Sequence, residues 1–588
     1  MARHLEEHVD RLPFGSAEKA RRYDTDRYRG AVGLNWYTCD PTLQARMRRD
    51  LGDGFEWARP HLESAGALMG GPIAERAEET DRNPPRLEKY DRWGHDISRV
   101  VMPETFEASK RDLLAQDFAR PSFRREAAEA GVPQRPLTAA WSYLLNQAEI
   151  GMTCALGTGT DMVEVSVERF APDDVKERVR QLAADGSMIG ETAQLFTERT
   201  GGSDLAALET TATPDGDAWR LNGFKWFASN ANGSAFIVLA KPEGAPDGTR
   251  GIAPFLVLGE RRDGRRNGIR IRRLKDKLGT KAVASAEVEL IDAEAFMLAP
   301  GGDGEGGGGD GRGLARMMEM TNGARLGIAM MGLGCARRSL VESILYAGAR
   351  DAFGQPLIEQ PLMQRKLAEM IVETEAAMAL CFDGYLTPMR IGAPLIKLRA
   401  ARLGITAASD AIEIHGGNGY IEQWPVARLL RDAQVNTIWE GPDNILCLDV
   451  RRAIRRDQAH LPFLDRLRQA CAAGPGGDEV TVEAVTNAVS RAEQALEVWA
   501  GLDDPVSEAR LFGLSQLLVD VYAAALLVEH AGWEERELGS DRGALVARLH
   551  VRDHLDSQDP MARLAEPAED LERFKELADG ALVDERTA

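Results

Sequence analysis

Strand-like sequence is confined to one stretch in the middle of this chain. Residues 217–221 and 224–228 are two short strand-like runs, and the dipeptide Asn222-Gly223 separates them. Asn-Gly between two such runs is the strongest short-range signal of a β-hairpin. Three further strand-like runs follow, at residues 236–239, 255–258 and 286–290. We therefore expect a β domain over residues 189–300.

The sequence on both sides of this stretch is helical in pattern. Residues 40–188 predict an N-terminal α-helical domain, and a polar, charged segment at residues 1–39 predicts an arm before it. Residues 312–456 predict a second helical domain, and residues 480–588 predict an acidic helical extension beyond the Gly- and Pro-rich segment 472–477. Because helices and strands are segregated along the chain, the expected fold class is α+β, without an alternating βαβ sheet.

The net charge of -20 is concentrated toward the C-terminal end of the chain. Residues 457–588 contain 12 Lys and Arg against 27 Asp and Glu. Proteins bind nucleic acid mainly through Lys and Arg on phosphate groups, so this composition disfavours DNA as a partner. The one basic candidate is the cluster Arg451, Arg452, Arg455 and Arg456, which we interpret as a solvated helix end.

Composition also bears on compartment and metals. The first residues contain no apolar run, so we expect no signal peptide. No stretch reaches the roughly 20 apolar residues that span a membrane, so we expect no membrane partner. The six Cys residues are scattered without a Cys-x-x-Cys pair, which is typical of reduced thiols in a cytoplasmic protein. The nine His residues form no His-Glu-x-x-His pattern, so no metal site is expected.

The carboxylate of Glu440 has sequence neighbours that can bury an acid. Glu440 lies between Trp439 and a Gly441-Pro442 turn, with apolar residues on both flanks. Burial in such a setting raises the pKa of an acid and suits it to proton abstraction near neutral pH. Taken alone, the run favours a turn with a solvated Glu, and the functional interpretation depends on the motifs that accompany it.

Three motifs in a fixed order accompany this carboxylate. The first is residues 196–204, Phe-Thr-Glu-Arg-Thr-Gly-Gly-Ser-Asp, followed by residues 225–230, Lys-Trp-Phe-Ala-Ser-Asn. The second is residues 350–357, Arg-Asp-Ala-Phe-Gly-Gln-Pro-Leu. The third is residues 414–420, Ile-His-Gly-Gly-Asn-Gly-Tyr, which precedes the Glu440 run. Together they resemble the motifs of the flavin-dependent acyl-CoA dehydrogenases.

Closer similarity points to the AidB-like branch of that superfamily. Residues 83–91, Asn-Pro-Pro-Arg-Leu-Glu-Lys-Tyr-Asp, resemble the N-terminal region of the branch, and so do several segments further along. The resemblance spans about residues 40 to 455. It implies an N-terminal α-helical domain, a middle antiparallel β domain and a C-terminal four-helix-bundle domain, to which this chain adds its helical extension.

The resemblance implies α,β-dehydrogenation of an acyl-CoA thioester. A carboxylate removes the α-proton while the β-hydrogen leaves as hydride to N5 of FAD, and hydrogen-bond donors stabilise the thioester oxygen. Glu440 occupies the position of the catalytic base. Some members place the base before the Arg of the first helix after the β domain, where this chain has Ala324 before Arg325. The implied substrate-binding residues are Ser203, Arg325, Glu440 and Gly441.

The implied flavin contacts fall within the expected β domain and in the helical domain after it. Phe227 matches an aromatic that covers the flavin ring, and Ser229 matches a hydroxyl near N5. Arg350 and Phe353 match residues that a neighbouring subunit contributes to the adenine end. The full set carried over is Phe196, Thr197, Ser203, Phe227, Ser229, Arg350, Phe353, Glu413, Gly416, Gly417 and Asn444. For Gly416 and Gly417, an ordinary helix end explains the glycines as well.

The chain departs from the family's pattern at four positions near the flavin. Pro442 and Asn444 replace a Thr and a Gln, and proline cannot donate a hydrogen bond. Glu413 replaces a Gln beside the Gly-Gly pair, and Pro361 replaces a Gln in the subunit-crossing site. These changes affect the fit of the flavin and leave the base in place.

Two functions are carried forward from the resemblance. The first is a homotetrameric FAD enzyme acting on acyl-CoA, with electron-transferring flavoprotein as a partner. The second is an AidB-like flavoprotein associated with DNA and with protection against alkylation damage, which the acidic C-terminal segment disfavours.

Overall fold

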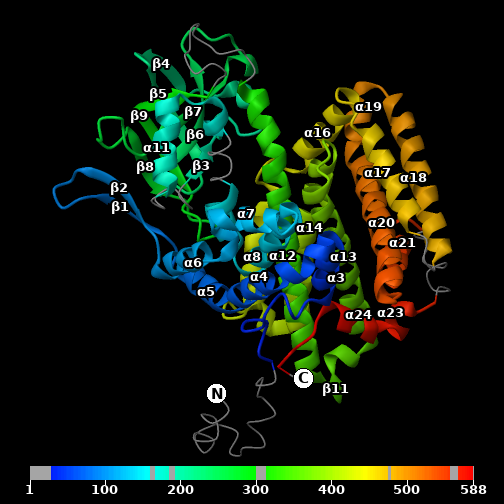
Figure 1. Ribbon diagram of the computed structural model, residues 1–588. Coiled ribbons are helices and arrows are strands. Elements are labelled where there is room, and N and C mark those ends of the chain that lie inside the picture. Colours follow the sequence, from blue (N-terminus) through cyan, green and yellow to red (C-terminus); the bar gives the residue numbers. More distant parts are fainter. Residues whose placement is uncertain are drawn as a thin grey trace, which may run out of the picture.

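The computed structural model describes residues 28–158, 166–184, 192–298, 313–474, 478–556 and 567–586. A helical body, a β body and a second helical body follow one another along the chain, and a further helical body is added at the C-terminal end (Figure 1). The expected order of segments is confirmed. Residues 1–27 of the expected arm lie outside the described residues.

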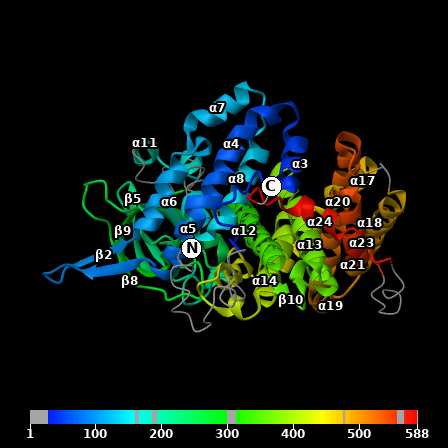
Figure 2. The ribbon, with the colours of Figure 1, turned by 90° about the horizontal axis from the view of Figure 1, so that it is seen from below.

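The N-terminal body is helical with one projecting hairpin. The tip of that hairpin, between β1 and β2, points away from the molecule in both views (Figure 1, Figure 2), while β2 contacts the β body, where the N–H of Ile271 donates to the hydroxyl of Ser98 at 2.9 Å. The elements are α3 (Pro41–Leu51), α4 (Phe55–Leu68), α5 (Ala74–Arg82), β1 (Arg86–Tyr90), β2 (Asp96–Val101), α6 (Glu104–Leu114), α7 (Pro121–Glu129), α8 (Gln134–Ala148), α9 (Ile150–Thr153) and α11 (Asp173–Ala184).

Residues 28–39 are packed into this body and do not form an arm. Trp36 and Tyr37 are buried, and the indole Nε1 of Trp36 donates to the carbonyl of Ala31 at 2.9 Å. The guanidinium of Arg338 lies over the Trp36 ring at 4.8 Å from its centroid. The sequence predicts an arm because the residues around these aromatics are polar and charged. It does not show that Trp36 and Tyr37 pack against the helical body.

The β body is a small barrel. Strands β6, β4, β5, β9 and β7 pair in that order, and β7 pairs back with β6, so the ladder closes on itself. Closure removes the unpaired edges of an open sheet. Strand β6 runs parallel to β3 and β4, and the other described pairs are antiparallel. The strands are β3 (Thr192–Leu195), β4 (Thr211–Asp215), β5 (Ala218–Ala228), β6 (Ala235–Pro242), β7 (Ala253–Leu258), β8 (Ile269–Leu274) and β9 (Ala286–Met297).

The predicted hairpin at Asn222-Gly223 is wrong. Strand β5 runs straight through this dipeptide, and the chain reverses one hairpin earlier, where Gly216 has a φ of +65°. Gly223 serves a close approach, since a Cβ there would lie 2.3 Å from the hydroxyl oxygen of Thr210. The Asn222 side chain donates to Asp292 at 3.1 Å across the barrel wall.

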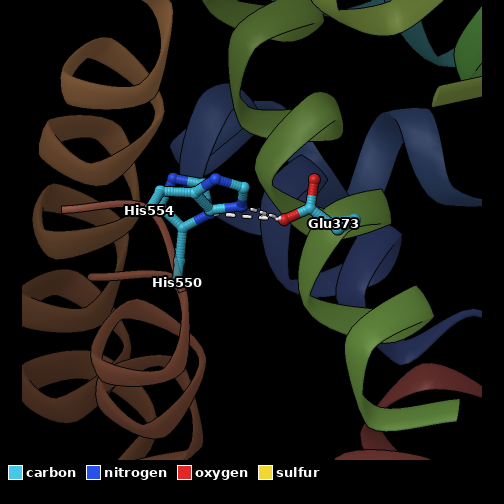
Figure 3. Close-up of side chains that lie close together, drawn as sticks. All are labelled: Glu373, His550 and His554. Carbon is cyan, nitrogen blue, oxygen red and sulfur yellow. Dashed lines mark hydrogen bonds and ion pairs between the residues drawn. The ribbon is translucent and has the colours of Figure 1, made fainter. Parts of the chain in front are cut away.

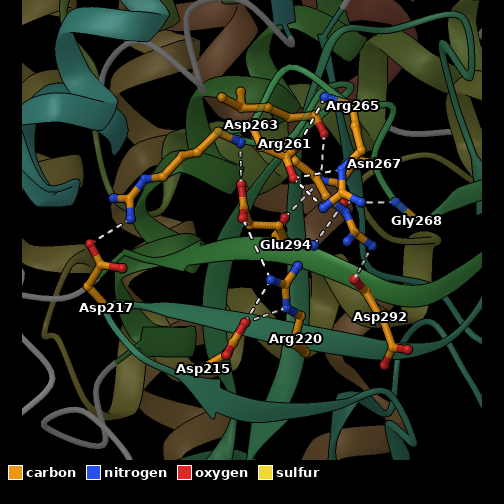
Figure 4. Close-up of polar contacts among 12 residues, drawn as sticks. Asp215, Asp217, Arg220, Arg261, Asp263, Arg265, Asn267, Gly268, Asp292 and Glu294 are labelled. Atoms are coloured by element: carbon orange, nitrogen blue, oxygen red, sulfur yellow. Dashed lines mark hydrogen bonds and ion pairs between the residues drawn. The ribbon is translucent and has the colours of Figure 1, made fainter.

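The buried side-chain amide of Asn267 hydrogen-bonds backbone groups of several segments at one end of the barrel. Asn267 donates through Nδ2 to the carbonyls of Leu258 and Glu294, at 2.8 and 2.9 Å. Its Oδ1 accepts from the N–H groups of Gly268 and Glu294, both at 2.8 Å. Figure 4 shows this amide surrounded by ion pairs, among them Arg220 with Asp215. All donors and acceptors of one buried side chain are thereby satisfied, which favours a single arrangement.

The third body is built around the long helix α12, which reaches from the barrel through the centre of the molecule (Figure 1). It packs closely on α14, because Gly332 and Gly404 let the two backbones approach; a Cβ at Gly332 would lie 2.3 Å from the carbonyl oxygen of Ala400. The elements are α12 (Gly313–Ala349), β10 (Asp351–Ala352), β11 (Gln355–Pro356), α13 (Pro361–Leu386), α14 (Gly392–His415), α15 (Pro425–Ala433) and α16 (Asp443–Arg455).

The C-terminal extension packs against the bundle on the side away from the barrel (Figure 1, Figure 2). Arg466 pairs with Asp383 of α13 at 2.7 Å, and Arg542 pairs with Glu375 of α13 at 2.6 Å. One apolar core runs from the N-terminal body through the bundle into the extension. The helices are α17 (His460–Ala473), α18 (Glu479–Ala500), α19 (Asp504–Ala509), α20 (Leu511–Leu538), α21 (Arg542–His554), α23 (Glu569–Glu572) and α24 (Phe574–Ala581).

Helix α20 is the central helix of this extension. Contrary to the expectation from the sequence, it is long and apolar enough to cross a membrane, with a mean hydropathy of 1.9 over its most apolar window. That window is 72% buried inside the protein, as in the core helix of a globular domain. Its apolar character is explained by packing on both sides.

Candidate active site

Glu440 occupies a strained turn between the short helix Gln434–Thr437 and α16. Its φ is +55°, a left-handed conformation that residues with a Cβ rarely adopt, and Gly441 follows with a φ of +103°. Such a conformation costs about 1–3 kcal/mol and persists where surrounding contacts hold it. The carbonyl of Glu440 accepts from Nε of Arg325 at 3.3 Å, and the carbonyl of Gly441 accepts from Nζ of Lys397 at 2.6 Å.

The carboxylate itself points to the β body. Gln194, on β3, donates from Nε2 to Oε1 of Glu440 at 2.5 Å. Burial raises the pKa of Glu440 above its usual value, while the charge of Arg325, the hydrogen bond from Gln194 and the charge of Lys397 oppose that rise. The acid is therefore held in an apolar setting with its ionised form partly stabilised, as a general base requires.

The cations beneath this turn are fixed by their own partners. Arg325 forms a buried ion pair with Asp449, and Asp449 also pairs with Arg390 at 2.7 Å. Burial lowers the pKa of Lys397 to about 8. The alternative position for a base holds Ala324, a buried methyl group, so Glu440 is the acid at this turn.

The backbone of the turn offers a donor. The N–H of Glu440 donates no hydrogen bond to any part of the chain that the structure describes. A donor left unpaired beside a carboxylate can stabilise a developing negative charge on a substrate oxygen. The Glu440 turn thus places a carboxylate and an unpaired backbone donor in one residue.

The predicted flavin-ring residues lie at the ends of β3 and β5. The N–H of Trp226 donates to the carbonyl of Thr197 at 2.9 Å, which joins the loop after β3 to β5. Phe227 is 52% exposed and Ser203 is exposed, while Thr197 and Ser229 are half-buried. Because Gln194 precedes Phe196 and Thr197 by two and three residues, these side chains are on the barrel end that meets Glu440.

A buried ion pair supports that loop. Nζ of Lys225 contacts Oε1 of Glu198 at 2.6 Å and donates to the carbonyl of Leu239 at 2.7 Å. Glu198 also accepts from the N–H groups of Glu209 and Thr210, at 2.6 and 3.2 Å. The Thr-Glu-Arg motif is therefore fixed through its buried glutamate, and Arg199 lies over the ring of Trp226 at 4.7 Å from its centroid.

Four of the remaining predicted flavin residues, Arg350, Phe353, Gly416 and Gly417, lie far from Glu440 within one chain. Phe353 projects from the β10–β11 turn and is 96% exposed, and Arg350 beside it is exposed. Gly416 and Gly417 end helix α14, whose other end carries Lys397. Eighteen residues of helix at about 1.5 Å each separate Lys397 from His415 by roughly 27 Å. One flavin can meet both groups only if a second subunit supplies one of them.

The distal glycines leave open space. Gly416 has a φ of +57°, and a Cβ at Gly416 or Gly417 would meet no described atom within 4 Å. Glu413 and Asn444 are exposed. The arrangement of exposed hydroxyls, an exposed aromatic and open glycine backbone fits a long polar cofactor that ends in a flat ring.

Four functional side chains were not predicted from sequence: Gln194, Lys397, Asp449 and Arg390. Lys397 carries a signal, because it is the only charged residue within the apolar run 391–398, and a buried lysine needs a partner. Gln194 carries no sequence signal, since its role follows from where β3 ends.

A cavity of about 300 Å³ lies within the helical bundle. It lies between α12, α14 and the end of α13, and it is lined by Asn322, Gly323, Leu326, Met389 and Ile396. Tyr522 from α20 contributes to its wall, so the extension forms part of the lining. Asn322 accepts from Arg325 at 3.1 Å, which connects the cavity to the Glu440 turn.

Three family models match the chain in sequence. The acyl-CoA dehydrogenase C-terminal domain matches residues 311–455, the acyl-CoA dehydrogenase middle domain matches residues 193–293, and the adaptive response protein AidB N-terminal domain matches residues 29–184. This chain belongs to the acyl-CoA dehydrogenase family. The N-terminal match places it in the AidB-like branch.

Known relatives agree with this assignment. Acyl-CoA dehydrogenase family member 11 of Caenorhabditis elegans is 30% identical, over 84% of this chain and 84% of its own length. AidB of Escherichia coli is 30% identical, over 72% of this chain and 78% of its own length. The chain is accordingly a flavin oxidoreductase that acts on CH–CH bonds, and FAD is its cofactor.

Solved structures show the same fold. The crystal structure of C. elegans ACDH-11 in complex with C11-CoA has a TM-score of 0.77 and 27% identity, and the match covers 90% of this chain and 93% of that one. An acyl-CoA dehydrogenase from Bacillus anthracis, complexed with FAD, has a TM-score of 0.61 at 20% identity, over 86% of this chain and 93% of that one.

Proposed function

We propose that this protein removes the α-proton of an acyl-CoA thioester with Glu440 as the base. The observation that carries the proposal is the Glu440 turn, where a half-buried carboxylate with a raised pKa adjoins its own unpaired N–H. FAD, when bound, supplies the acceptor for the β-hydride.

Other residues of the chain bind the substrate, position the base or hold FAD in this proposal. The Glu440 N–H is placed to bind the thioester oxygen, while Gln194 and Arg325 hold the carboxylate and its backbone in position. Phe196, Thr197, Ser203, Phe227 and Ser229 would hold the ring end of FAD. Arg350, Phe353, Gly416 and Gly417 would hold the far end of a flavin that another subunit binds, which motivates a homotetramer. Electron-transferring flavoprotein is the proposed electron acceptor.

The DNA-associated alternative is not favoured. Arg451 pairs with Asp504 at 2.8 Å and with Glu508 at 2.9 Å, and Arg455 pairs with Asp504 at 2.5 Å. Two of the four arginines of the basic cluster are therefore paired with carboxylates of α19, which reduces the attraction of the cluster for phosphate groups.

Anaerobic mixing with a panel of acyl-CoA thioesters tests the proposal. We expect at least one thioester to bleach the visible flavin band of the purified protein. Glu440→Gln keeps the shape of the side chain and removes the base, so it should slow bleaching by about 10²- to 10⁴-fold.

Glu483→Gln, an exposed change on α18, serves as the matched control and should bleach at the wild-type rate. Bleaching by Glu440→Gln at the wild-type rate, or no bleaching with any thioester, would contradict the proposal.

A further inference from the structure

Two histidines and a glutamate converge where the extension meets the bundle. His550 and His554 lie one turn apart on α21, and both rings face Glu373 of α13 (Figure 3). Nε2 of His554 lies 2.5 Å from Oε1 of Glu373, and Nδ1 of His550 lies 3.8 Å from the same oxygen. One ligand atom from each side chain falls within 4.8 Å of the other two.

One member of this cluster has an unused nitrogen. His550 is fully buried, and its Nδ1 has no hydrogen-bond partner among the described residues. Its Nε2 lies 3.4 Å from the carbonyl of Asp520, which fixes the tautomer with the proton on Nε2. With the proton on Nε2, the ring keeps a lone pair on Nδ1, which faces Glu373. A buried acceptor without a partner is costly unless something else binds it.

The surroundings orient all three side chains. Nδ1 of His554 lies 3.9 Å from Oδ1 of Asp520, so a carboxylate stands behind that ring. Arg399 of α14 contacts Oε2 of Glu373 at 2.8 Å and Oδ1 of Asp520 at 3.2 Å, which leaves Oε1 of Glu373 turned toward the rings. Arg399 also lies 3.1 Å from Nε2 of His554, so a metal at that nitrogen would replace this contact and the direct contact between Nε2 and Oε1 of Glu373.

We propose that Glu373, His550 and His554 form a binding site for a divalent transition metal of the Zn²⁺ class. Two imidazoles and one carboxylate are ligands that Zn²⁺ accepts, with bonds of about 2.0–2.2 Å and a fourth position for water. Metal-binding histidines commonly donate their other ring N–H to a carbonyl or a carboxylate, and the carbonyl of Asp520 is such an acceptor for Nε2 of His550. The nearby charges are those of Glu373, Asp520 and Arg399, so a net negative charge faces the site when both rings are neutral.

The position of this site indicates what it does. Glu373 belongs to the bundle, whereas both histidines belong to the extension, so a bound metal would cross-link the two. The sequence was expected to lack a metal site, because no His-Glu-x-x-His motif is present. The motif here is split: the spacing of His550 and His554 puts both on one helix face, and the third ligand comes from 177 residues away in the sequence.

Metal titration of the full-length holoprotein tests the proposal. The protein is stripped with a chelator, dialysed and titrated with Zn²⁺ by calorimetry, and its metal content and Tm are measured. We expect one equivalent of Zn²⁺ per chain and a Tm that rises with Zn²⁺. His554→Gln and Glu373→Gln should each weaken binding by about 10-fold or more. His95→Gln, which alters an exposed histidine on the β1–β2 hairpin, should leave Zn²⁺ binding unchanged.

Two outcomes would overturn the proposal. One is a wild-type protein that takes up no more Zn²⁺ than a fraction of an equivalent, in which case the cluster is an ion-pair network only. The other is equal Zn²⁺ affinity in the wild type and in both ligand variants. The wild-type stoichiometry decides by itself if a variant fails to fold.

Discussion

Glu440 combines a raised pKa with a backbone conformation that neighbouring residues must hold. The base has to be ionised to accept a proton, so activity is lost as the pH falls through the raised pKa of Glu440. The acidic limb of the rate profile should therefore lie above the pH at which an exposed glutamate titrates. Gln194 opposes this shift, because its amide stabilises the ionised carboxylate.

Replacing that amide gives a prediction at the residue scale. Gln194→Leu removes the donor to Glu440 while keeping the size of the side chain. The pKa of Glu440 should rise further, and the acidic limb of kcat/KM should move to higher pH. Stopped-flow flavin reduction across a pH series measures this shift.

Gln116→Leu, in a loop of the N-terminal body, is the control and should keep the wild-type profile. An unchanged limb in Gln194→Leu would mean that this amide does not tune the base.

At the scale of elements, the flavin loop depends on a buried ion pair between two strands. Lys225 of β5 is fully buried, and Glu198 follows β3 and is almost fully buried. Burial lowers the pKa of Lys225 to about 8, although Glu198 opposes this. The pair therefore stays charged near neutral pH, and each partner is needed to compensate the other.

Breaking this pair should destabilise the barrel strongly. Lys225→Met leaves Glu198 buried without its cation, which costs about 3–5 kcal/mol. Urea unfolding followed by the fluorescence of Trp219 and Trp226 measures the loss.

Arg272→Met removes one partner of an exposed pair with Glu289 on the same barrel, and it should cost less than about 1 kcal/mol. Equal losses of stability in the two variants would contradict the prediction, because the buried Lys225–Glu198 pair would then contribute no more than an exposed pair.

At the scale of the whole molecule, one chain leaves the proposed flavin site incomplete. The two groups of predicted flavin residues are separated by most of the length of α14. Phe353 is almost fully exposed on a hairpin tip, where an aromatic ring gains nothing from the rest of its own chain. A neighbouring subunit that covers this ring would account for both observations.

Truncating that ring tests the assembly. Phe353→Ala should weaken FAD retention by about 2 kcal/mol, the loss typical of a central interface aromatic. It should leave the unfolding of the chain itself unchanged, because no described residue packs over the ring. Flavin content and molecular mass in solution are the measurements.

Phe512→Ala, at a half-exposed aromatic of the extension, is the matched control and should retain FAD as the wild type does. A Phe353→Ala protein with wild-type flavin content and mass would contradict a subunit-crossing site.

The sequence by itself determined the order of the helical and β bodies, the family and the candidate base. These follow from local information: strand runs, helical periodicity and motifs whose residues are adjacent in the chain. Local information also failed in a characteristic way at Asn222-Gly223. Asn222-Gly223 favours a turn but lies inside β5. Glycine is needed at position 223 because Thr210 lies too close to leave room for a side chain.

The tertiary structure alone decided which distant residues meet. Gln194 reaches Glu440 across 246 positions, residues 28–39 pack into the core, and His550 and His554 face a glutamate of another body. None of these contacts leaves a periodic or motif signal, because each depends on how folded bodies dock. The physical reason is that docking is governed by the shape and charge of assembled surfaces, to which residues far apart in sequence contribute together.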